Sequence, residues 1–538
     1  MKDKSLKQLE KLMDKAGKGD AEAQCELADR YYDGNGVPQD YNKAYTLWRQ
    51  SAEKGIKKSI NCVGVCYYAG RGVPQSYEEA VKWYTRAAEL GYAAAQENLG
   101  YCYKCGIGVV KDYEKSMSWY TRAAEQKRGK AYTALGEFYR YGTGVEKELT
   151  KAFGLFKKAA ELGDGEGQWY LADCFMYGLG VKQDKSKAFY WYSKSAESGN
   201  MSGQCSLGYC YENGISCVAD IKKAAELYLK AAEQGDKIAQ CNIANFYRYG
   251  KGVEIDNKKS FYWYTKSAER GNVRAQCNLG DCYYYGGGTP KDYSKAVYWY
   301  TKAYDAGEVS ATDNLGLCYL LGKGTAADYN KAFELLSKAA ENNLSMGMYG
   351  LAVCYMNGRG TAKDAVKAFK YFKMSADAGN AQGCYYTGIC LEKGIGVAVN
   401  ANLAGQYFKK AAEKGNADGQ SKTAYYYYNA LGGFPRDYAQ AVSWYKKAAA
   451  QGNDMAYCNL GVCYVDGRGV PRDYATAVKW YTKSAQNGNM NSQYNLAGCY
   501  RYGNGVAVDR AKAIYWYEKS AAQGYQKAKD ALKELRGY

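Results

Sequence analysis

The feature that most constrains this chain is a phrase, WYTKSAE or WYTRAAE, that returns at a fixed interval. The residues that end successive copies lie 36 residues apart, apart from one interval of 37 between Gly415 and Gly452. These ending residues are Gly19, Gly55, Gly91, Lys127, Gly163, Gly199, Gly235, Gly271, Gly307, Asn343, Gly379, Gly415, Gly452, Gly488 and Gly524. A fixed period of about 20–50 residues is typical of repeat proteins and argues against several separate globular domains. We therefore expect one continuous solenoid of fourteen repeats over residues 19–523, with capping helices at 1–18 and 524–538.

Each repeat contains two predicted helices when its positions are counted from the ending residue as zero. Position 8 is usually Leu and position 12 is nearly always aromatic, as at Leu27 and Tyr31, so both lie on one helical face. Position 9 is Gly or Ala in every repeat, which lets a neighbouring helix approach closely. A Gly-x-Gly motif ends the first helix. An Asp is placed to cap the second, as at Asp40 and Asp112. The pattern predicts an all-α fold of helix-loop-helix repeats.

The phrase ALGxxY-x2-GxGV-x2-DYxKAxxWYxKAAExG, nearly complete at residues 134–163, closely resembles the repeat of the Sel-one-like repeat family. That family is a relative of the tetratricopeptide repeat, and the resemblance spans residues 19–523. It implies a right-handed superhelical α-solenoid of about fourteen 36-residue repeats whose first helices line the concave side. Members of the family are mostly adaptors that hold proteins together in signalling, quality-control or host-contact roles. The fold alone transfers none of these particular roles to this chain.

Composition excludes several kinds of chemistry. The chain has no His, which removes Ser-His-Asp and Cys-His catalysis and His-ligated zinc. The recurring carboxylates are helix caps or members of a charge ladder, and the Gly-x-Gly loops end helices where a phosphate loop would follow a strand. The sequence therefore predicts a non-enzymatic protein with no cofactor and no metal. No membrane span or signal peptide is apparent, so we expect a cytoplasmic protein, with non-classical export as the alternative.

The 19 Cys occupy packing positions of the repeat. Ten fall at position 11, as at Cys66, and five at position 6, as at Cys25. In a Cys-rich branch of the resembled family, bridges join the end of a second helix to the next repeat, but here that end is Ala-Ala or Ser-Ala. We interpret these residues as small buried hydrophobes in a reducing compartment. The one CxxC, Cys102 to Cys105, has no second pair that would complete a zinc site.

The net charge of +18 follows largely from the repeat as well. Together, positions 24 and 31 of the second helix supply 22 Lys or Arg, and Glu often follows position 31 by three residues, as at Arg86 and Glu89. This spacing predicts a ladder of charges on a solvated outer face. An electrostatic preference for an acidic partner is the alternative interpretation.

Positions 6, 10, 13 and 14 vary between repeats while positions 8, 9 and 12 stay fixed. In tetratricopeptide repeats the corresponding stripe of the first helix contacts ligand. Aromatic and Arg side chains on such a wall are typical of binding hot spots. The candidate partner-binding residues are Arg140, Tyr141, Trp169, Arg248, Tyr249, Tyr284, Tyr285, Tyr349, Tyr385, Tyr494, Arg501 and Tyr502. The alternative is that these rings fill gaps between neighbouring repeats.

The preferred functional hypothesis is a protein–protein interaction scaffold, or adaptor, that binds a peptide or protein in its concave groove. Single-stranded nucleic-acid binding is one alternative, because helical repeats can each read one base and the groove mixes Arg with Tyr. Recognition of a glycan or cell-wall fragment on the Tyr-rich wall is another. The sequence names neither the partner nor the oligomeric state.

Overall fold

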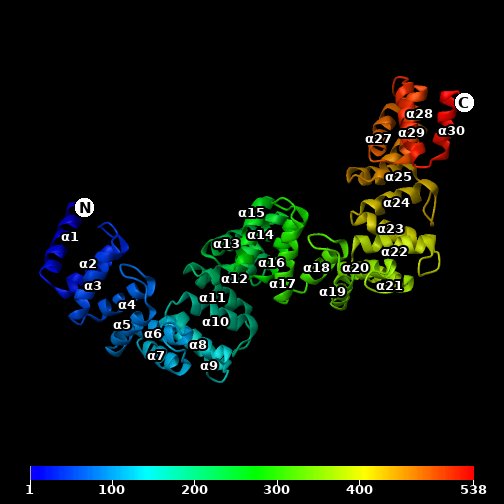
Figure 1. Ribbon diagram of the computed structural model, residues 1–538. Coiled ribbons are helices and arrows are strands. Elements are labelled where there is room, and N and C mark those ends of the chain that lie inside the picture. Colours follow the sequence, from blue (N-terminus) through cyan, green and yellow to red (C-terminus); the bar gives the residue numbers. More distant parts are fainter. Residues whose placement is uncertain (1, 538) are drawn as a thin grey trace. The chain divides into compact units, whose positions relative to one another are not determined.

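The computed structural model describes the backbone of residues 2–537 and the side chains of residues 7–537. Over this part of the chain there are thirty helices and no strand (Figure 1). One helix is followed by fourteen helix pairs and a final helix, which confirms the predicted all-α helix-loop-helix repeats.

The chain divides into two compact units, Met1–Asn272 and Val273–Tyr538, and each contains seven helix pairs. The helices of the first unit are α1 (Lys2–Gly17), α2 (Ala21–Asp33), α3 (Tyr41–Glu53), α4 (Lys57–Ala69), α5 (Tyr77–Glu89), α6 (Ala93–Cys105), α7 (Tyr113–Glu125), α8 (Gly129–Tyr141), α9 (Leu149–Glu161), α10 (Gly165–Tyr177), α11 (Lys185–Glu197), α12 (Met201–Asn213), α13 (Ile221–Gln234), α14 (Lys237–Tyr249) and α15 (Asn257–Glu269).

The helices of the second unit are α16 (Val273–Tyr285), α17 (Tyr293–Asp305), α18 (Ala311–Leu321), α19 (Tyr329–Glu341), α20 (Ser345–Asn357), α21 (Ala365–Asp377), α22 (Ala381–Lys393), α23 (Ala401–Glu413), α24 (Ala417–Asn429), α25 (Tyr438–Ala450), α26 (Asp454–Asp466), α27 (Tyr474–Gln486), α28 (Met490–Tyr502), α29 (Arg510–Ala522) and α30 (Gln526–Arg536). The first helices of the repeats therefore have even numbers from α2 to α28, and the second helices have odd numbers.

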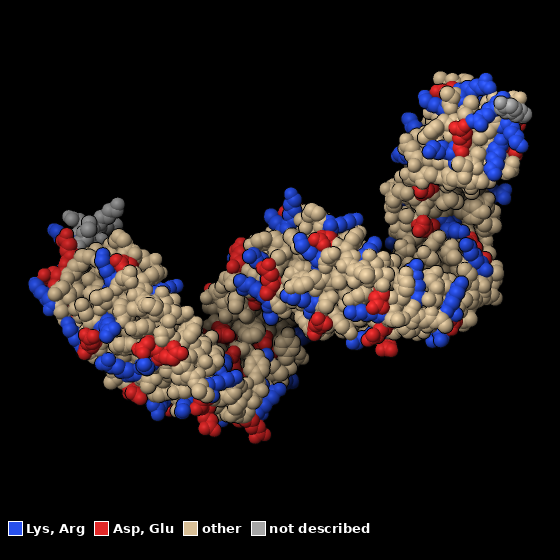
Figure 2. Space-filling model, in the orientation of Figure 1, with Lys and Arg blue, Asp and Glu red and all other residues tan. Residues whose placement is uncertain are grey.

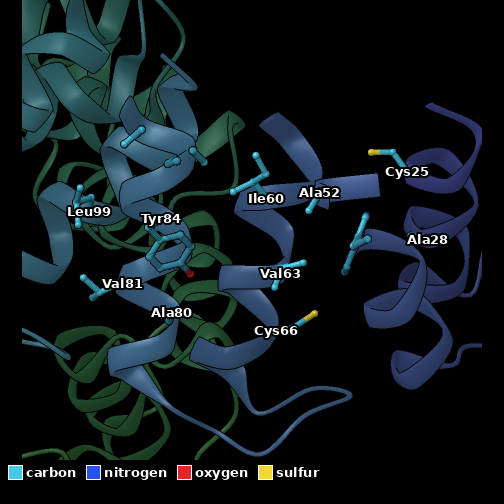
Figure 3. Close-up of a cluster of buried hydrophobic side chains, with 14 of the residues drawn as sticks. Cys25, Ala28, Ala52, Ile60, Val63, Cys66, Ala80, Val81, Tyr84 and Leu99 are labelled. Atoms are coloured by element: carbon cyan, nitrogen blue, oxygen red, sulfur yellow. The ribbon is translucent and has the colours of Figure 1, made fainter. Parts of the chain in front are cut away.

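The core lies between the two helices of a repeat and the first helix of the next. In Figure 3, Tyr84 of α5 lies among apolar side chains of neighbouring helices, including Val63 and Leu99. A small residue at position 9 makes this packing possible: a Cβ added at Gly64 would lie 2.7 Å from the ring of Tyr84. The close approach predicted for position 9 is therefore confirmed.

The predicted helix ends are confirmed as well. The Asp40 side chain accepts a hydrogen bond from the backbone N–H of Lys43, which lowers the pKa of Asp40 and caps α3. Asp112, Asp292 and Asp473 cap later second helices in the same way. Gly34 ends α2 with a φ of 71°, a left-handed conformation that favours glycine.

The Cys side chains mostly belong to this core. Sixteen of the 19 are buried, and the three others are Cys62, Cys105 and Cys217. Burial raises the pKa of the Cys66 thiol to about 12 and that of Cys102 to about 11, so both stay protonated at neutral pH. Their interpretation as packing residues is confirmed. Within residues 7–537, His, Cys, Asp and Glu form no group that could hold a metal ion.

The charged side chains of the second helices form the predicted ladder only in part. Lys194 and Glu197 form the expected pair at 2.8 Å. Arg86, however, lies over the ring of Trp83, with its guanidinium carbon 5.6 Å from the ring centroid. Many position-24 lysines pair with the capping Asp three residues earlier, as Lys115 does with Asp112 at 3.3 Å. Figure 2 shows the two signs of charge interspersed over the visible face. Among the described helices, none is long and apolar enough to cross a membrane.

Candidate interaction surface on the first helices

Positions 3, 7, 10 and 14 of a first helix share one face, because steps of four and three residues return to the same side of an α-helix. We call the surface formed by this face in neighbouring repeats the first-helix wall. In the second unit, side chains from this wall line three cavities, of about 360, 540 and 500 Å³. All three volumes lie in the range of roughly 300–1,000 Å³ that is usual for ligand sites.

The 360 Å³ cavity is the most aromatic of the three, and we call it the tyrosine cavity. It is lined by Tyr284, Tyr285, Tyr300, Asn314, Leu317, Leu321, Met346, Tyr349, Gln382, Tyr386 and Asp418. All of these residues except Tyr300 belong to the first helices α16, α18, α20, α22 and α24. Five consecutive repeats therefore converge on one site.

The 540 Å³ cavity continues along the same wall. Tyr385, Tyr425 and Asp418 line it, and Asp418 also lines the tyrosine cavity, so the two cavities adjoin. Inside this second cavity Lys422 pairs with Glu392 at 2.7 Å, and the Tyr426 hydroxyl donates to the same carboxylate at 3.1 Å. The 500 Å³ cavity lies farther along the chain and is lined by residues of α26 to α30.

Seven of the twelve residues predicted from the sequence line these cavities. Tyr284, Tyr285 and Tyr349 line the tyrosine cavity and Tyr385 lines the second cavity. Tyr494, Arg501 and Tyr502 line the third.

Position 14 gives the most open side chains of the predicted set. Tyr141, Tyr249, Tyr285 and Tyr502 are all between 58 and 63% exposed. An Arg guanidinium lies beside three of these rings, at 5.6 Å for Arg140 and Tyr141, 5.6 Å for Arg248 and Tyr249, and 5.0 Å for Arg501 and Tyr502.

Position 13, by contrast, turns toward the following repeat. Arg140 pairs with Asp173 at 2.9 Å, and both side chains are largely buried. The same carboxylate accepts a hydrogen bond of 2.7 Å from the Tyr192 hydroxyl. Arg501 pairs with Glu534 of α30 at 3.0 Å. These contacts join repeats, so Arg140 and Arg501 already have carboxylate partners.

Position 6 also lies against neighbouring helices. The Trp169 indole N–H donates to the Ser206 hydroxyl of the next first helix at 3.0 Å. The ring of Tyr349 lies 5.9 Å from that of Phe372 and 5.7 Å from that of Tyr386. Tyr385 packs on Phe408, with ring centroids 5.9 Å apart, and Tyr494 on Tyr517 at 5.5 Å. These side chains fill space between repeats while also reaching the wall.

The residues predicted from the sequence omit two wall residues, because the predicted stripe does not include positions 3 and 7. Tyr386 occupies position 7 and Asp418 position 3. The first unit also carries exposed tyrosines at positions 10 and 14 that were not singled out, namely Tyr101, Tyr177 and Tyr209. Helical spacing from position 14 back to positions 10, 7 and 3 would have found all five.

An all-α solenoid of repeated helix pairs, with variable side chains along one wall, defines a helical-repeat protein. The family model described as Sel1 repeat matches residues 21–56, 63–92, 93–127, 129–164, 165–200, 202–236, 237–272, 273–308, 309–344, 345–380, 381–416, 417–453, 454–489 and 491–525. The chain belongs to the Sel1 repeat family, as the resemblance implied. Proteins with this fold are generally interaction scaffolds.

A solved structure agrees with this assignment. The chain is similar to c5321, a protective antigen of uropathogenic Escherichia coli strains that displays an SLR fold, with 28% identity and a TM-score of 0.54. That similarity covers 90% of this chain and 97% of the other. A Sel1 repeat protein from Oxalobacter formigenes is 30% identical over 57% of this chain and 88% of its own, with a TM-score of 0.41. No curated protein sequence matches the chain.

Proposed function

We propose that this protein is a non-catalytic scaffold that binds an extended peptide segment of a partner protein along the first-helix wall of its second unit. The observation that carries the proposal is the pair of adjoining cavities between α16 and α26, which share Asp418 and are lined almost wholly by first-helix side chains. A peptide is long enough to place side chains in both cavities, whereas a compact small molecule would fill one.

The wall chemistry supports a peptide ligand. Tyr supplies large contact area at low conformational cost and is enriched in binding hot spots. Tyr285 and Tyr425 are 58 and 43% exposed, so each can bury further area against a ligand. Gln382 and Asn459 line the two cavities as well and offer amide groups to a peptide backbone.

The test is selection from a displayed library of random dodecamer peptides on the full-length protein, followed by affinity measurement. We expect Tyr285→Ala and Tyr425→Ala each to weaken the selected peptides by tenfold or more, about 1.4 kcal/mol. The matched control is Tyr298→Ala, because Tyr298 of the second helix α17 is 51% exposed and lines neither cavity. Failure to select any peptide, or equal losses in all three variants, would contradict the proposal.

A further inference from the structure

The tyrosine cavity combines aromatic rings with a carboxylate at its edge. Tyr285, Tyr300, Tyr349 and Tyr386 contribute rings from four helices. Asp418 is exposed and accepts a hydrogen bond of 2.8 Å from the side-chain amide of Asn453. It is the one charged side chain among the residues that line this cavity.

Two further carboxylates lie behind the rings. Asp281 accepts a hydrogen bond of 2.8 Å from the Tyr300 hydroxyl. Burial raises the pKa of Tyr285, and the negative charges of Asp281 and Asp313 raise it further, so both carboxylates act on a ring that lines the cavity. Three carboxylates thus lie at or near a cavity that has no Lys or Arg among its lining residues, although the net charge of the chain is +18.

One ring that lines the cavity, that of Tyr284, already holds a cation of the chain in this manner. The Lys323 ammonium lies 5.1 Å from the ring centroid of Tyr284 and 5.2 Å from that of Tyr293. Tyr rings carry negative charge on their faces and attract ammonium and guanidinium groups within about 6 Å. Lys323 is thus bound by two rings at one edge, and it is not among the residues that line the cavity itself.

We propose that the tyrosine cavity binds the cationic side chain of a Lys or Arg in the partner peptide. The aromatic rings contact the aliphatic stem and the charged group, and Asp418 pairs with that group at the rim. Charge complementarity selects this occupant, because a phosphate or an acidic side chain would meet the Asp418 carboxylate at the rim and the charges of Asp281 and Asp313 near the rings. The inference rests on the proposed function and adds the chemistry of one residue of the peptide.

The experiment compares the peptides selected on the full-length protein with their neutral counterparts. We expect Lys or Arg to be enriched at one fixed position. Replacing that residue by citrulline for Arg, or by norleucine for Lys, should weaken binding about tenfold. Asp418→Asn should cause a similar loss for the charged peptide and little change for the neutral one. The Asn side chain keeps the acceptor for Asn453.

Asp454→Asn is the matched control. Asp454 is also in the first turn of a first helix and also accepts a hydrogen bond from an Asn side chain, that of Asn487 at the end of α27, but it does not line the described cavities. We expect its effect on the charged peptide to be small. Helical circular dichroism of all variants should match that of the wild type, because both aspartates lie near the surface.

The outcomes separate the two proposals. Peptides that lose affinity with Tyr425→Ala but bind equally with citrulline or norleucine would overturn the cation site and leave the peptide-binding function standing. Enrichment of acidic peptides would also overturn the cation site. Binding of a trimethyllysine peptide where the Lys and Arg peptides fail would overturn the assignment of the cavity to an unmodified Lys or Arg side chain. Absence of any selected peptide would overturn both.

Discussion

The first-helix wall of the fourth and fifth repeats, which begin with α8 and α10, differs from that of the eighth to twelfth repeats, which begin with α16 to α24. Every one of these repeats is built from the same kind of helix pair. In repeats 4 and 5 the wall is bridged by charges: Arg140 pairs with Asp173, and Lys104 of the preceding repeat pairs with Glu137. In repeats 9 and 10 the residues at position 10 are Leu317 and Val353, so no carboxylate is available there for the preceding repeat.

This difference shows how one scaffold makes two kinds of surface. In repeats 4 and 5, opposite charges at positions 13 and 10 of adjacent repeats make the Arg140 and Asp173 side chains cross from one helix to the next. Where these positions carry Tyr284 and Leu317, the rings of several repeats surround a cavity of about 360 Å³. Charge pairs and cavities are not exclusive, because Lys422 and Glu392 join two repeats inside the 540 Å³ cavity. The residues at positions 13 and 10 therefore contribute to how a repeat meets its neighbour, and the surrounding side chains decide whether a cavity remains.

The largest effect that tests this comparison is expected from Asp173→Ala. The change leaves the largely buried Arg140 without its carboxylate and removes the acceptor of the Tyr192 hydroxyl. Breaking one partner of a buried pair costs about 3–5 kcal/mol. Native-state hydrogen exchange should show this loss in the opening free energy of α8, α10 and α11, while the second unit stays unchanged.

Asp377→Ala is the matched control for that measurement. Asp377 pairs with Lys373 at 2.8 Å on a helix surface where both side chains are about half exposed. Exposed pairs of this kind contribute about 0–1 kcal/mol. Similar losses in the two variants would mean that burial of the Arg140 pair contributes nothing, and the comparison of the two walls would fail.

The fold was predictable from the sequence because its determinants recur in every repeat. Three features appear at a fixed spacing: the capping Asp, the aromatic residue at position 12 and the small residue at position 9. An error in interpreting one repeat therefore leaves the predicted fold unchanged. Gly64 and Asp40 behave in the structure as the pattern predicted.

The candidate surface was less predictable, because it depends on pairs of residues in different repeats. Arg140 was expected on the open wall, and its partner Asp173 lies 33 residues later, at position 10 of the next repeat. Trp169 reaches Ser206, which is 37 residues away. Comparing positions across neighbouring repeats would have found the charge pair. A cavity is the space left between side chains of several adjacent repeats. The residue types found at a single repeat position do not reveal that space.

A smaller effect on stability is expected from the titration of Asp313, a buried carboxyl in the second unit, where the first-helix wall contains cavities. Burial raises the pKa of Asp313 to about 6, with a further contribution from the charge of Asp281. The backbone N–H groups of Asn314 and Gly347 donate to Asp313 and oppose the shift in part. In the second unit this carboxyl is thus neutralised by a proton at mildly acid pH, whereas Asp173 in the first unit has Arg140.

The direction of the pH dependence follows from the raised pKa of Asp313. Between about pH 4 and pH 6 the folded protein holds a proton on Asp313 that the unfolded chain releases, so the free energy of unfolding of the second unit should fall as pH rises through this window. The expected fall is about 2–3 kcal/mol, since one pKa unit corresponds to about 1.4 kcal/mol. Asp313→Asn should remove this part of the pH dependence in urea titrations. An unchanged pH profile in that variant would contradict the assignment.

The smallest effects on stability are expected from replacing either of two glycines in neighbouring repeats by Ala. The added methyl group would contact different atoms at the two positions. A Cβ at Gly461, position 9 of α26, would lie 2.3 Å from the ring of Tyr481, whereas one at Gly498, position 10 of α28, would lie 3.7 Å from the Tyr517 hydroxyl. Overpacking of a core costs about 1–3 kcal/mol, so Gly461→Ala should lower the urea midpoint. Gly498→Ala should raise it by the equivalent of about 0.5–1 kcal/mol, because Ala is the better helix former and the wall is open at that point. Gly498 lines the 500 Å³ cavity, so a destabilising Gly498→Ala would show that this part of the wall is closed and that the open surface ends before the last repeat.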